Sequence, residues 1–140
     1  MAQSIINSLR AEPRRCGSQP FLKADPVRWN DLLFKAASFH AGDMKRHRYF
    51  SHQSAEGGSP GQRIDRVGYV WQSYGENIAH NSPNLRATFE DWLNSPPHCH
   101  AIMQPDFRHF GLACEKAEDE LYWVLELAAP GSLGLRTRGK

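Results

Sequence analysis

The order of the predicted elements limits the possible folds more than any other feature of this sequence. Two apolar segments, 111–114 and 121–127, predict β-strands, and the polar residues 117–120 between them predict a turn. Much of the chain before this hairpin instead carries apolar residues three and four positions apart, which is typical of helices. Helices followed by a late antiparallel hairpin predict an α+β domain in which helices pack on a sheet.

The longest helical stripe follows Asn30, whose side chain suits an N-cap. Leu33, Ala37, His40 and Met44 come after it at spacings of four, three and four residues. A helix would carry all of them on one face. We therefore expect His40 to lie in the core with a hydrogen-bond partner rather than to bind a ligand.

Ser59, Pro60 and Gln62 predict the start of another helix. Together they form a capping box with proline at the first helical position, and Gly68 suits the helix end. The segment 57–61 also matches the G-x-S-x-G pattern of hydrolases, but Pro60 lacks the backbone N–H that their oxyanion hole requires. We therefore interpret Ser59 as a helix cap and not as a nucleophile.

Two more helices are predicted from weaker signals. Residues 2–11 predict a short helix at the start of the chain. Ser82 and Pro83 predict the cap and first residue of a later helix, which the prolines beginning at Pro96 should end. The mixed aromatic segment 69–79 predicts no regular element.

Length and charge exclude several classes of protein. The chain has 140 residues, so we expect one domain over 1–130 and a loose tail over 131–140. A net charge of +2 with scattered basic residues does not indicate nucleic-acid binding. No apolar run approaches the ~20 residues that span a bilayer, and the first residues lack the charged and apolar regions of a signal peptide. The protein is therefore either cytosolic, or secreted with its signal absent from this sequence.

His52, Glu76 and His98 are the candidate site residues. They lie far apart in the sequence, so only the fold could bring them together. Imidazole and carboxylate groups bind divalent metals and transfer protons, but the residue types alone leave a metal site, a catalytic site and ordinary structural positions open. Zinc ligation by His98, Cys99 and Cys114 fits no common structural zinc spacing.

Several segments resemble, in order, motifs of the CAP superfamily, which comprises cysteine-rich secretory, antigen 5 and pathogenesis-related proteins. The resemblance is carried by Trp29–Leu33, Tyr49–His52, Gly58–Ile64, Gly75–Ala79, Trp92–Cys99 and Phe110–Ala113. It covers residues 5–129 and is strongest to bacterial members. It implies an α-β-α sandwich around a central three- or four-stranded antiparallel sheet.

The resemblance also implies a central cleft in which two histidines and two glutamates converge. It assigns His52 and His98 to the histidines and Glu76 to the glutamate of the G-E-N motif. Ser95 stands where plant members have the second glutamate. Two imidazoles could still hold Zn²⁺ or another divalent metal with open positions, and Glu76 would then accept a hydrogen bond from a metal-bound histidine.

A small ligand beside the metal is a further implication of the resemblance, and lipids, sterols and cell-wall glycans are the classes it suggests. Tyr69, Trp71 and Tyr74 are the aromatic residues expected to line this cleft, with core packing as the alternative for at least one of them. We expect the partner to be such a ligand or a cell-envelope component, and the protein to be a monomer.

Membership of this family would place the protein in the periplasm or outside the cell, where a disulfide can form. Three cysteines allow at most one internal bond. Cys16 with Cys99 is the preferred pair, because Cys114 is expected in a core strand.

Three functions remain open at this point. The preferred one is a secreted binding module that holds a divalent metal and a small ligand. A metal-dependent hydrolase could use Glu76 as general base, but the second glutamate is missing and no nucleophile is supported. A non-enzymatic interaction scaffold is the third possibility.

Overall fold

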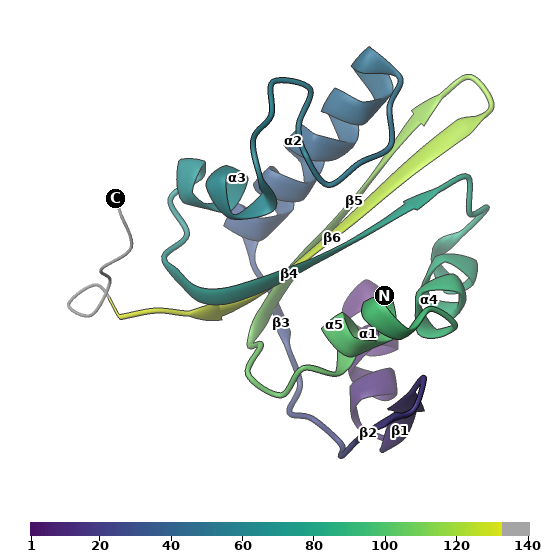
Figure 1. Cartoon of the computed structure of the whole chain (residues 1–140), viewed down its shortest axis with the longest axis vertical. Helices are drawn as coiled ribbons and strands as arrows, with labels where there is room; N and C mark the ends of the chain where they lie inside the picture. The colour runs from purple at the N-terminus through teal and green to yellow at the C-terminus, as the bar shows by residue number, and fades with distance from the viewer. Residues whose placement is uncertain (133–140) are drawn as a thin grey trace.

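A four-stranded sheet separates two layers of helices (Figure 1). The computed structural model describes residues 1–132, and the expected tail, 131–140, lies outside them from residue 133 onward. The strands occur in the order β3 (Arg28–Trp29), β5 (His109–Ala117), β6 (Glu120–Pro130) and β4 (Trp71–His80). Strands β4, β5 and β6 are antiparallel, whereas the short β3 runs parallel to β5. The predicted α+β sandwich is confirmed.

Each face of the sheet has its own helices (Figure 1). Helices α2 (Asp31–His47) and α3 (Pro60–Arg66) cover one face, and α1 (Ala2–Arg10), α4 (Leu85–Leu93) and α5 (Pro96–Met103) cover the other. A small hairpin of β1 (Arg14–Cys16) and β2 (Gln19–Phe21) contacts α5 through β1. Strand β4 forms an edge of the sheet, so segments from both helical layers can meet across it.

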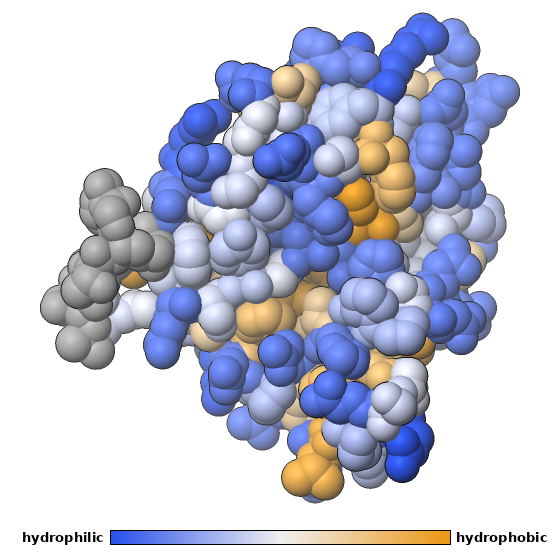
Figure 2. Space-filling view, viewed as in Figure 1, coloured by the Kyte–Doolittle hydropathy of each residue, from blue (hydrophilic) through white to orange (hydrophobic). Residues whose placement is uncertain are grey.

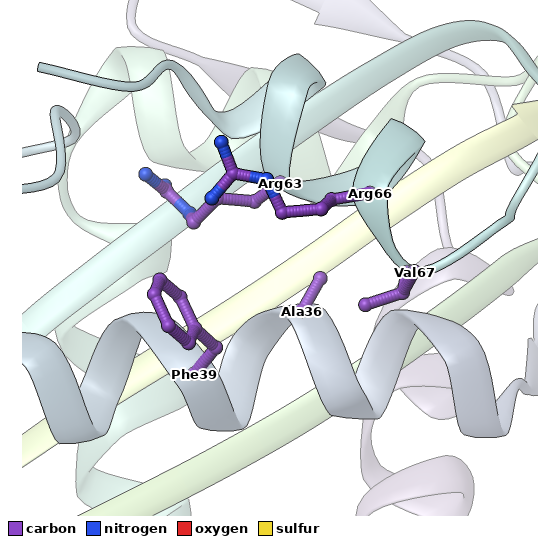
Figure 3. Close-up of a pocket in the computed structure, with 5 residues that line it drawn as sticks. All are labelled: Ala36, Phe39, Arg63, Arg66 and Val67. Carbon is purple, nitrogen blue, oxygen red and sulfur yellow. The ribbon is translucent and has the colours of Figure 1, made fainter.

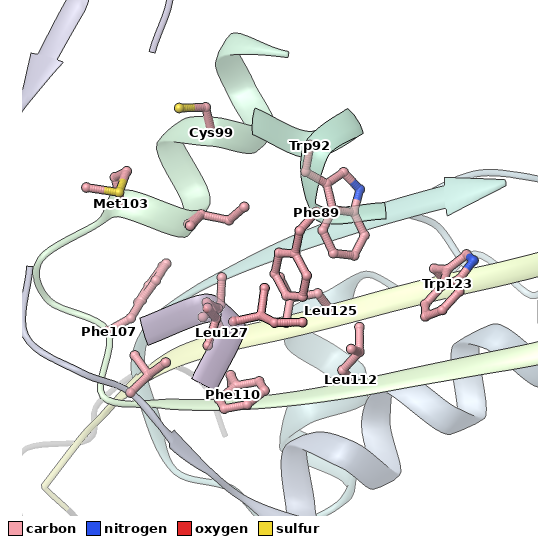
Figure 4. Close-up of a cluster of buried hydrophobic side chains, with 14 of the residues drawn as sticks. Phe89, Trp92, Cys99, Met103, Phe107, Phe110, Leu112, Trp123, Leu125 and Leu127 are labelled. Carbon is pink, nitrogen blue, oxygen red and sulfur yellow. The ribbon is translucent and has the colours of Figure 1, made fainter. Parts of the chain in front are cut away.

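The larger hydrophobic core lies between the sheet and the layer of α1, α4 and α5 (Figure 4). The buried Trp92 ring of α4 belongs to it, and its Nε1 donates to the backbone oxygen of Ile78 in β4 at 3.0 Å. Because a buried indole N–H needs an acceptor, this bond fixes α4 against the edge strand.

The face drawn in Figure 2 is mostly hydrophilic, with hydrophobic residues in small patches. No helix within residues 1–132 combines the length and apolar character needed to cross a membrane.

Two predicted helix starts are confirmed by their caps. Asn30 accepts hydrogen bonds from the backbone N–H groups of Leu32 and Leu33 at the start of α2. Ser59 and Gln62 form the full capping box at the start of α3. Ser59 is therefore a helix cap, as the missing N–H of the following proline indicated.

The predicted start of α4 is wrong by two residues. Asn84, not Ser82, is the cap, and its side chain accepts from the backbone N–H of Ala87. The Ser82 hydroxyl instead donates to the Asp91 carboxylate at 2.7 Å, and a charged acceptor makes this bond stronger than a cap.

Strand β4 is absent from the sequence-based prediction, because Gly75, Glu76 and Asn77 interrupt its apolar pattern. Its extended conformation comes from pairing with β6, in which Glu76 lies opposite Glu126. The pairing is a long-range interaction that local sequence does not reveal.

Helix α5 is held in place by a buried arginine and by a disulfide. Arg10 is fully buried, and its Nη1 donates to the carbonyl oxygen of Ile102 at 2.7 Å. This carbonyl lies at the helix end, where the helix itself supplies no donor. Cys16 and Cys99 are joined by a disulfide that connects the hairpin to the same helix. Because His98 precedes Cys99, both interactions restrain the position of this candidate ligand.

Reduction of the disulfide should lower the free energy of unfolding by about 2–4 kcal/mol, because the bond restrains a long stretch of the unfolded chain. The bond joins residues 83 positions apart. Urea unfolding with and without reductant measures the change. Cys114 lies in β5, an interior strand of the sheet as expected, but its free thiol is exposed, so Cys114→Ser should leave the effect of the reductant unchanged. Equal stability in both conditions would contradict the prediction.

Helix α2 lies unusually close to the sheet where it crosses Gly111 of β5. A Cβ atom at this position would overlap the backbone of Leu33 and Phe34, so no other residue fits without displacing the helix. Gly111 also lies directly opposite Glu126 of β6, and the close helix covers that part of the sheet.

We expect Gly111→Ala to destabilise the protein by about 1–3 kcal/mol, because the methyl group meets backbone that cannot rotate away. Gly42→Ala is the matched control within α2. Its Cβ would meet only the end of the Arg46 side chain at 3.6 Å, so the helix should gain about 0.5–1 kcal/mol. Chemical denaturation of both variants tests the pair of predictions, and a loss of stability at both positions would refute the contrast.

Candidate functional site

The candidate site is built around Glu76 in the edge strand β4. Its side chain is only 2% exposed and lies between two partners. Oε1 is 2.6 Å from Nδ1 of His52, and Oε2 accepts from Nη2 of Arg63 at 2.7 Å. A carboxylate only accepts hydrogen bonds, so Nδ1 of His52 carries the proton. Whenever the ring is uncharged, Nε2 is therefore its unprotonated nitrogen, and the ring is half exposed to solvent.

The surroundings of Glu76 keep it ionised. Burial opposes its charge, but the neighbouring Glu126 carboxyl group, the hydrogen bond from His52 and the positive charge of Arg63 outweigh that penalty and hold the pKa of Glu76 at about 2. Glu126 faces it from β6, where burial and then the charge of Glu76 raise the pKa of Glu126 well above its ordinary value. Glu76 is thus a permanent acceptor that orients the His52 ring.

Buried side chains restrain the segment that carries His52. Arg63 donates through Nη2 to the backbone oxygen of His52 at 2.9 Å and through Nη1 to Oγ of Ser54 at 2.8 Å. His40 Nε2 lies 2.7 Å from the backbone oxygen of Ser51, which can only accept. Burial lowers the pKa of His40, so its ring is neutral and donates this bond. The prediction that His40 is a hydrogen-bonded core residue is confirmed.

His98 approaches the same edge from the opposite helical layer. It lies in the first turn of α5, and its backbone oxygen accepts from Nδ2 of Asn77 in β4 at 3.1 Å. Burial lowers the pKa of His98, and the charge of His52 lowers it further, so the two rings are electrostatic neighbours. His98 is therefore neutral at neutral pH, which is the form that binds metals. The structure brings His52, Glu76 and His98 to one edge of the sheet.

The three aromatic residues expected to line a ligand cleft occupy different environments. Tyr69 is buried beneath α2 and α3, and its hydroxyl pairs with Nδ1 of His109 at 2.7 Å, so it belongs to the core and does not line an open cleft. Trp71 and Tyr74 are partly exposed and pack edge to face, with ring centroids 4.8 Å apart, against Gly61 of α3. A contact of these two rings with ligand stays a prediction.

The protein ligands available to a metal are few. Within residues 1–132, no three side chains of histidine, cysteine, aspartate or glutamate converge in an arrangement that could hold a metal ion. Zinc in structural or catalytic sites has three or four protein ligands. His52 and His98 alone would leave at least two positions to water or to a bound molecule. These residues fit a weak, exchangeable site and not a structural zinc centre.

Sequence reasoning missed two residues of the site, Arg63 and Glu126. Arg63 had no recognisable signal, since it is one of two arginines in a short helix whose partner lies in a later strand. Glu126 had a recognisable signal, because it is the single acidic residue within the apolar strand segment 121–127.

Beside the site, the stem of Arg63 lines a cavity of about 90 Å³ between α2 and α3 (Figure 3). The other lining residues are Ala36, Phe39, Arg66 and Val67.

Two proteins of Bacillus subtilis (strain 168) have similar sequences. The chain is 36% identical over 90 residues to the uncharacterized membrane protein YlbC, and 34% identical over 110 residues to the uncharacterized protein YkwD. These matches cover 64% and 79% of this chain but 26% and 40% of the two relatives. The chain therefore spans less than half the length of either relative.

Solved structures of similar fold come from several organisms. An extracellular protein of Bacillus anthracis containing an SCP domain matches 76% of this chain and 34% of its own, with a TM-score of 0.67 and 28% identity. An outer surface protein of Borrelia burgdorferi covers 93% of both chains, with a TM-score of 0.75 and 24% identity. NaASP2, solved with Zn²⁺, covers 93% of this chain and 84% of its own, with a TM-score of 0.60 and 15% identity. The last two matches establish the fold alone.

The family comparison agrees with both the fold and the sequence motifs. The family model for the cysteine-rich secretory protein family, CAP, matches residues 3–127. This range contains every helix of the structure except the first residue of α1, and it contains His52, Glu76 and His98. The chain therefore belongs to the CAP family of cysteine-rich secretory proteins.

Proposed function

We propose that this domain acts outside the cytoplasm as a binding module whose cleft holds a divalent metal, such as Zn²⁺, between His52 and His98. One observation carries the proposal: ionised Glu76 holds Nδ1–H of His52, which leaves Nε2 as a lone-pair donor on a half-exposed ring. A carboxylate behind a histidine is the usual way in which proteins orient a metal ligand and increase its basicity. The relative NaASP2 was solved with Zn²⁺, which is consistent with metal binding on this fold.

The same geometry favours binding over hydrolysis with Glu76 as general base. Both oxygens of Glu76 are engaged, one by His52 and one by Arg63, and its side chain is almost inaccessible to solvent. A general base works best when its pKa lies near the operating pH, whereas the pKa of Glu76 is about 2. Glu76 therefore suits the orientation of His52 and is poorly placed to take a proton from water.

The open coordination positions suggest how a ligand would bind. With two imidazoles on the metal, a hydroxyl, carboxylate or phosphate oxygen of a bound molecule could complete the coordination sphere. Trp71 and Tyr74 offer aromatic surface on the same strand as Glu76. The extracellular and outer-surface relatives support secretion of this protein. The family resemblance suggests a cell-envelope lipid or glycan as the class of ligand.

We expect His52→Ala and His98→Ala each to weaken binding of Zn²⁺ at least tenfold, because each variant removes one of two protein ligands. Calorimetric titration of Zn²⁺ into metal-stripped protein measures the affinity. His100→Ala is the matched control, since it removes an imidazole from the same helix, where the ring packs edge to face against Phe21. Wild-type protein that binds no Zn²⁺, or two variants that bind as wild type does, would refute the proposed site.

Glu76→Gln should weaken Zn²⁺ binding by about 10- to 100-fold, because an amide holds the His52 ring less strongly than a carboxylate does. Glu120→Gln is the control. Oε1 of Glu120 lies 2.9 Å from Nε2 of His80 in a comparable pair, and neither residue is a proposed metal ligand. The same titration measures both affinities, with thermal unfolding as the check that each variant is folded. An unchanged affinity in Glu76→Gln would contradict the orienting role.

A further inference from the structure

Glu126 is a buried carboxyl group for which neither the family motifs nor the metal ligands account. It lies in β6 and is fully buried. Its neighbours on the same face of the strand, Val124 and Ala128, are fully buried apolar residues. On the β5 side it lies opposite Gly111, over which α2 packs closely. The group is therefore sealed from water on this face of the sheet.

A carboxylate in such a place needs donors, and Glu126 has none of its own. Neither of its oxygens accepts a hydrogen bond from any donor among the described residues. The cation whose charge reaches it, Arg63, is already paired with Oε2 of Glu76. An isolated ionised carboxylate in this environment is strongly disfavoured, so the group is expected to hold a proton.

The proton has one suitable acceptor. Glu76 lies directly opposite Glu126 in the antiparallel pair of β4 and β6, where side chains on the same face are in contact. Glu76 receives hydrogen bonds from Arg63 and His52, whereas Glu126 receives none. Two carboxyl groups in contact cannot both be ionised, and the one with the two donors keeps the charge.

We propose that Glu126 is a neutral acid that donates its O–H to the carboxylate of Glu76, and that this bond positions Glu76 toward His52. Glu126 is thus a positioning residue, acting on the imidazole through a second carboxyl group. The inference rests on the proposed function and deepens it, since it adds a residue that holds Glu76 in position behind His52, a proposed metal ligand. It can be tested without a metal.

The charge state is tested by replacing the proposed acid with its neutral isostere. Because the folded state raises the pKa of Glu126, its contribution to stability is present below the unfolded value of 4.5 and is lost as the pH rises toward the folded value. The Glu126→Gln variant has no such loss. Its melting temperature relative to wild type should therefore increase steadily from pH 4.5 to pH 7.5. A flat or falling difference would mean that Glu126 is ionised in the folded protein and would overturn the proposal.

Other ionisable groups near the pair do not change in the comparison. Glu76 from β4, Arg63 from α3 and His40 from α2 act on this cluster and are present in both proteins. The contributions of His40 and His52 cancel in the difference if the cluster keeps its geometry. The ring nitrogen signals of His52 check that geometry directly.

The positioning effect is tested on the tautomer of His52 by ¹⁵N NMR of metal-free protein. Wild type and Glu126→Gln should both show His52 protonated at Nδ1, because glutamine can also donate to Glu76. Glu126→Leu removes the donor and should shift a measurable fraction of His52 to the Nε2–H tautomer. Val124→Ala is the control for a defect in the same strand and should leave the tautomer unchanged.

The outcomes separate this inference from the metal proposal. If the wild type fails to bind Zn²⁺ but Glu126→Leu alone changes the His52 tautomer, the positioning role stands and the metal site does not. If Glu126→Leu keeps the wild-type tautomer, or if Val124→Ala alters it equally, the positioning role is refuted whatever the metal affinity. Should Glu126→Leu fail to fold, Glu126→Ala with the same NMR readout replaces it.

Discussion

The buried ion pair between Arg63 and Glu76 is the interaction on which the candidate site depends. The side chains of both residues are almost fully inaccessible to solvent, and Arg63 also bonds the His52 backbone and the Ser54 hydroxyl. One guanidinium thus joins helix α3, the segment that carries His52 and the edge strand β4. Such a pair contributes little net stability compared with apolar packing, but loss of either partner would leave a buried charge unpaired. Its value here lies in geometry, since it fixes a carboxylate beneath a histidine that is itself half exposed.

The position of β4 at the edge of the sheet explains why the site can form at all. A strand in the interior would have neighbours on both sides, whereas segments from the two helical layers can meet across an edge strand. Successive residues of β4 point to opposite faces, so Glu76 contacts the α3 side while Asn77 bonds the backbone of His98 in α5. The hydrogen bond from Arg10 to Ile102 and the disulfide between Cys16 and Cys99 restrain α5. The two histidines are therefore held by separate layers of the sandwich.

The chemistry of the site is dominated by one negative charge on two carboxyl groups. Arg63 and His52 stabilise that charge on Glu76, and the apolar surroundings of Glu126 exclude a second one. This arrangement makes the His52 ring a better lone-pair donor but leaves Glu76 too weak a base for proton abstraction. It therefore favours the proposed ligand binding at the histidines over hydrolysis.

The sequence by itself determined the elements that depend on local interactions: the capped starts of α2 and α3, the late hairpin of β5 and β6, and the core position of His40. These features follow from side chains that bond to or pack against residues close to them in the sequence. The motifs also singled out His52, Glu76 and His98 through family resemblance. Only the tertiary structure decided four other features: strand β4, the cap of α4 at Asn84, the burial of Tyr69 and the exposure of Cys114. The tertiary structure also decided the contact of Glu76 with Arg63 and Glu126. The pairing of strands far apart in sequence and the close approach of α2 at Gly111 determine which polar groups are buried next to one another.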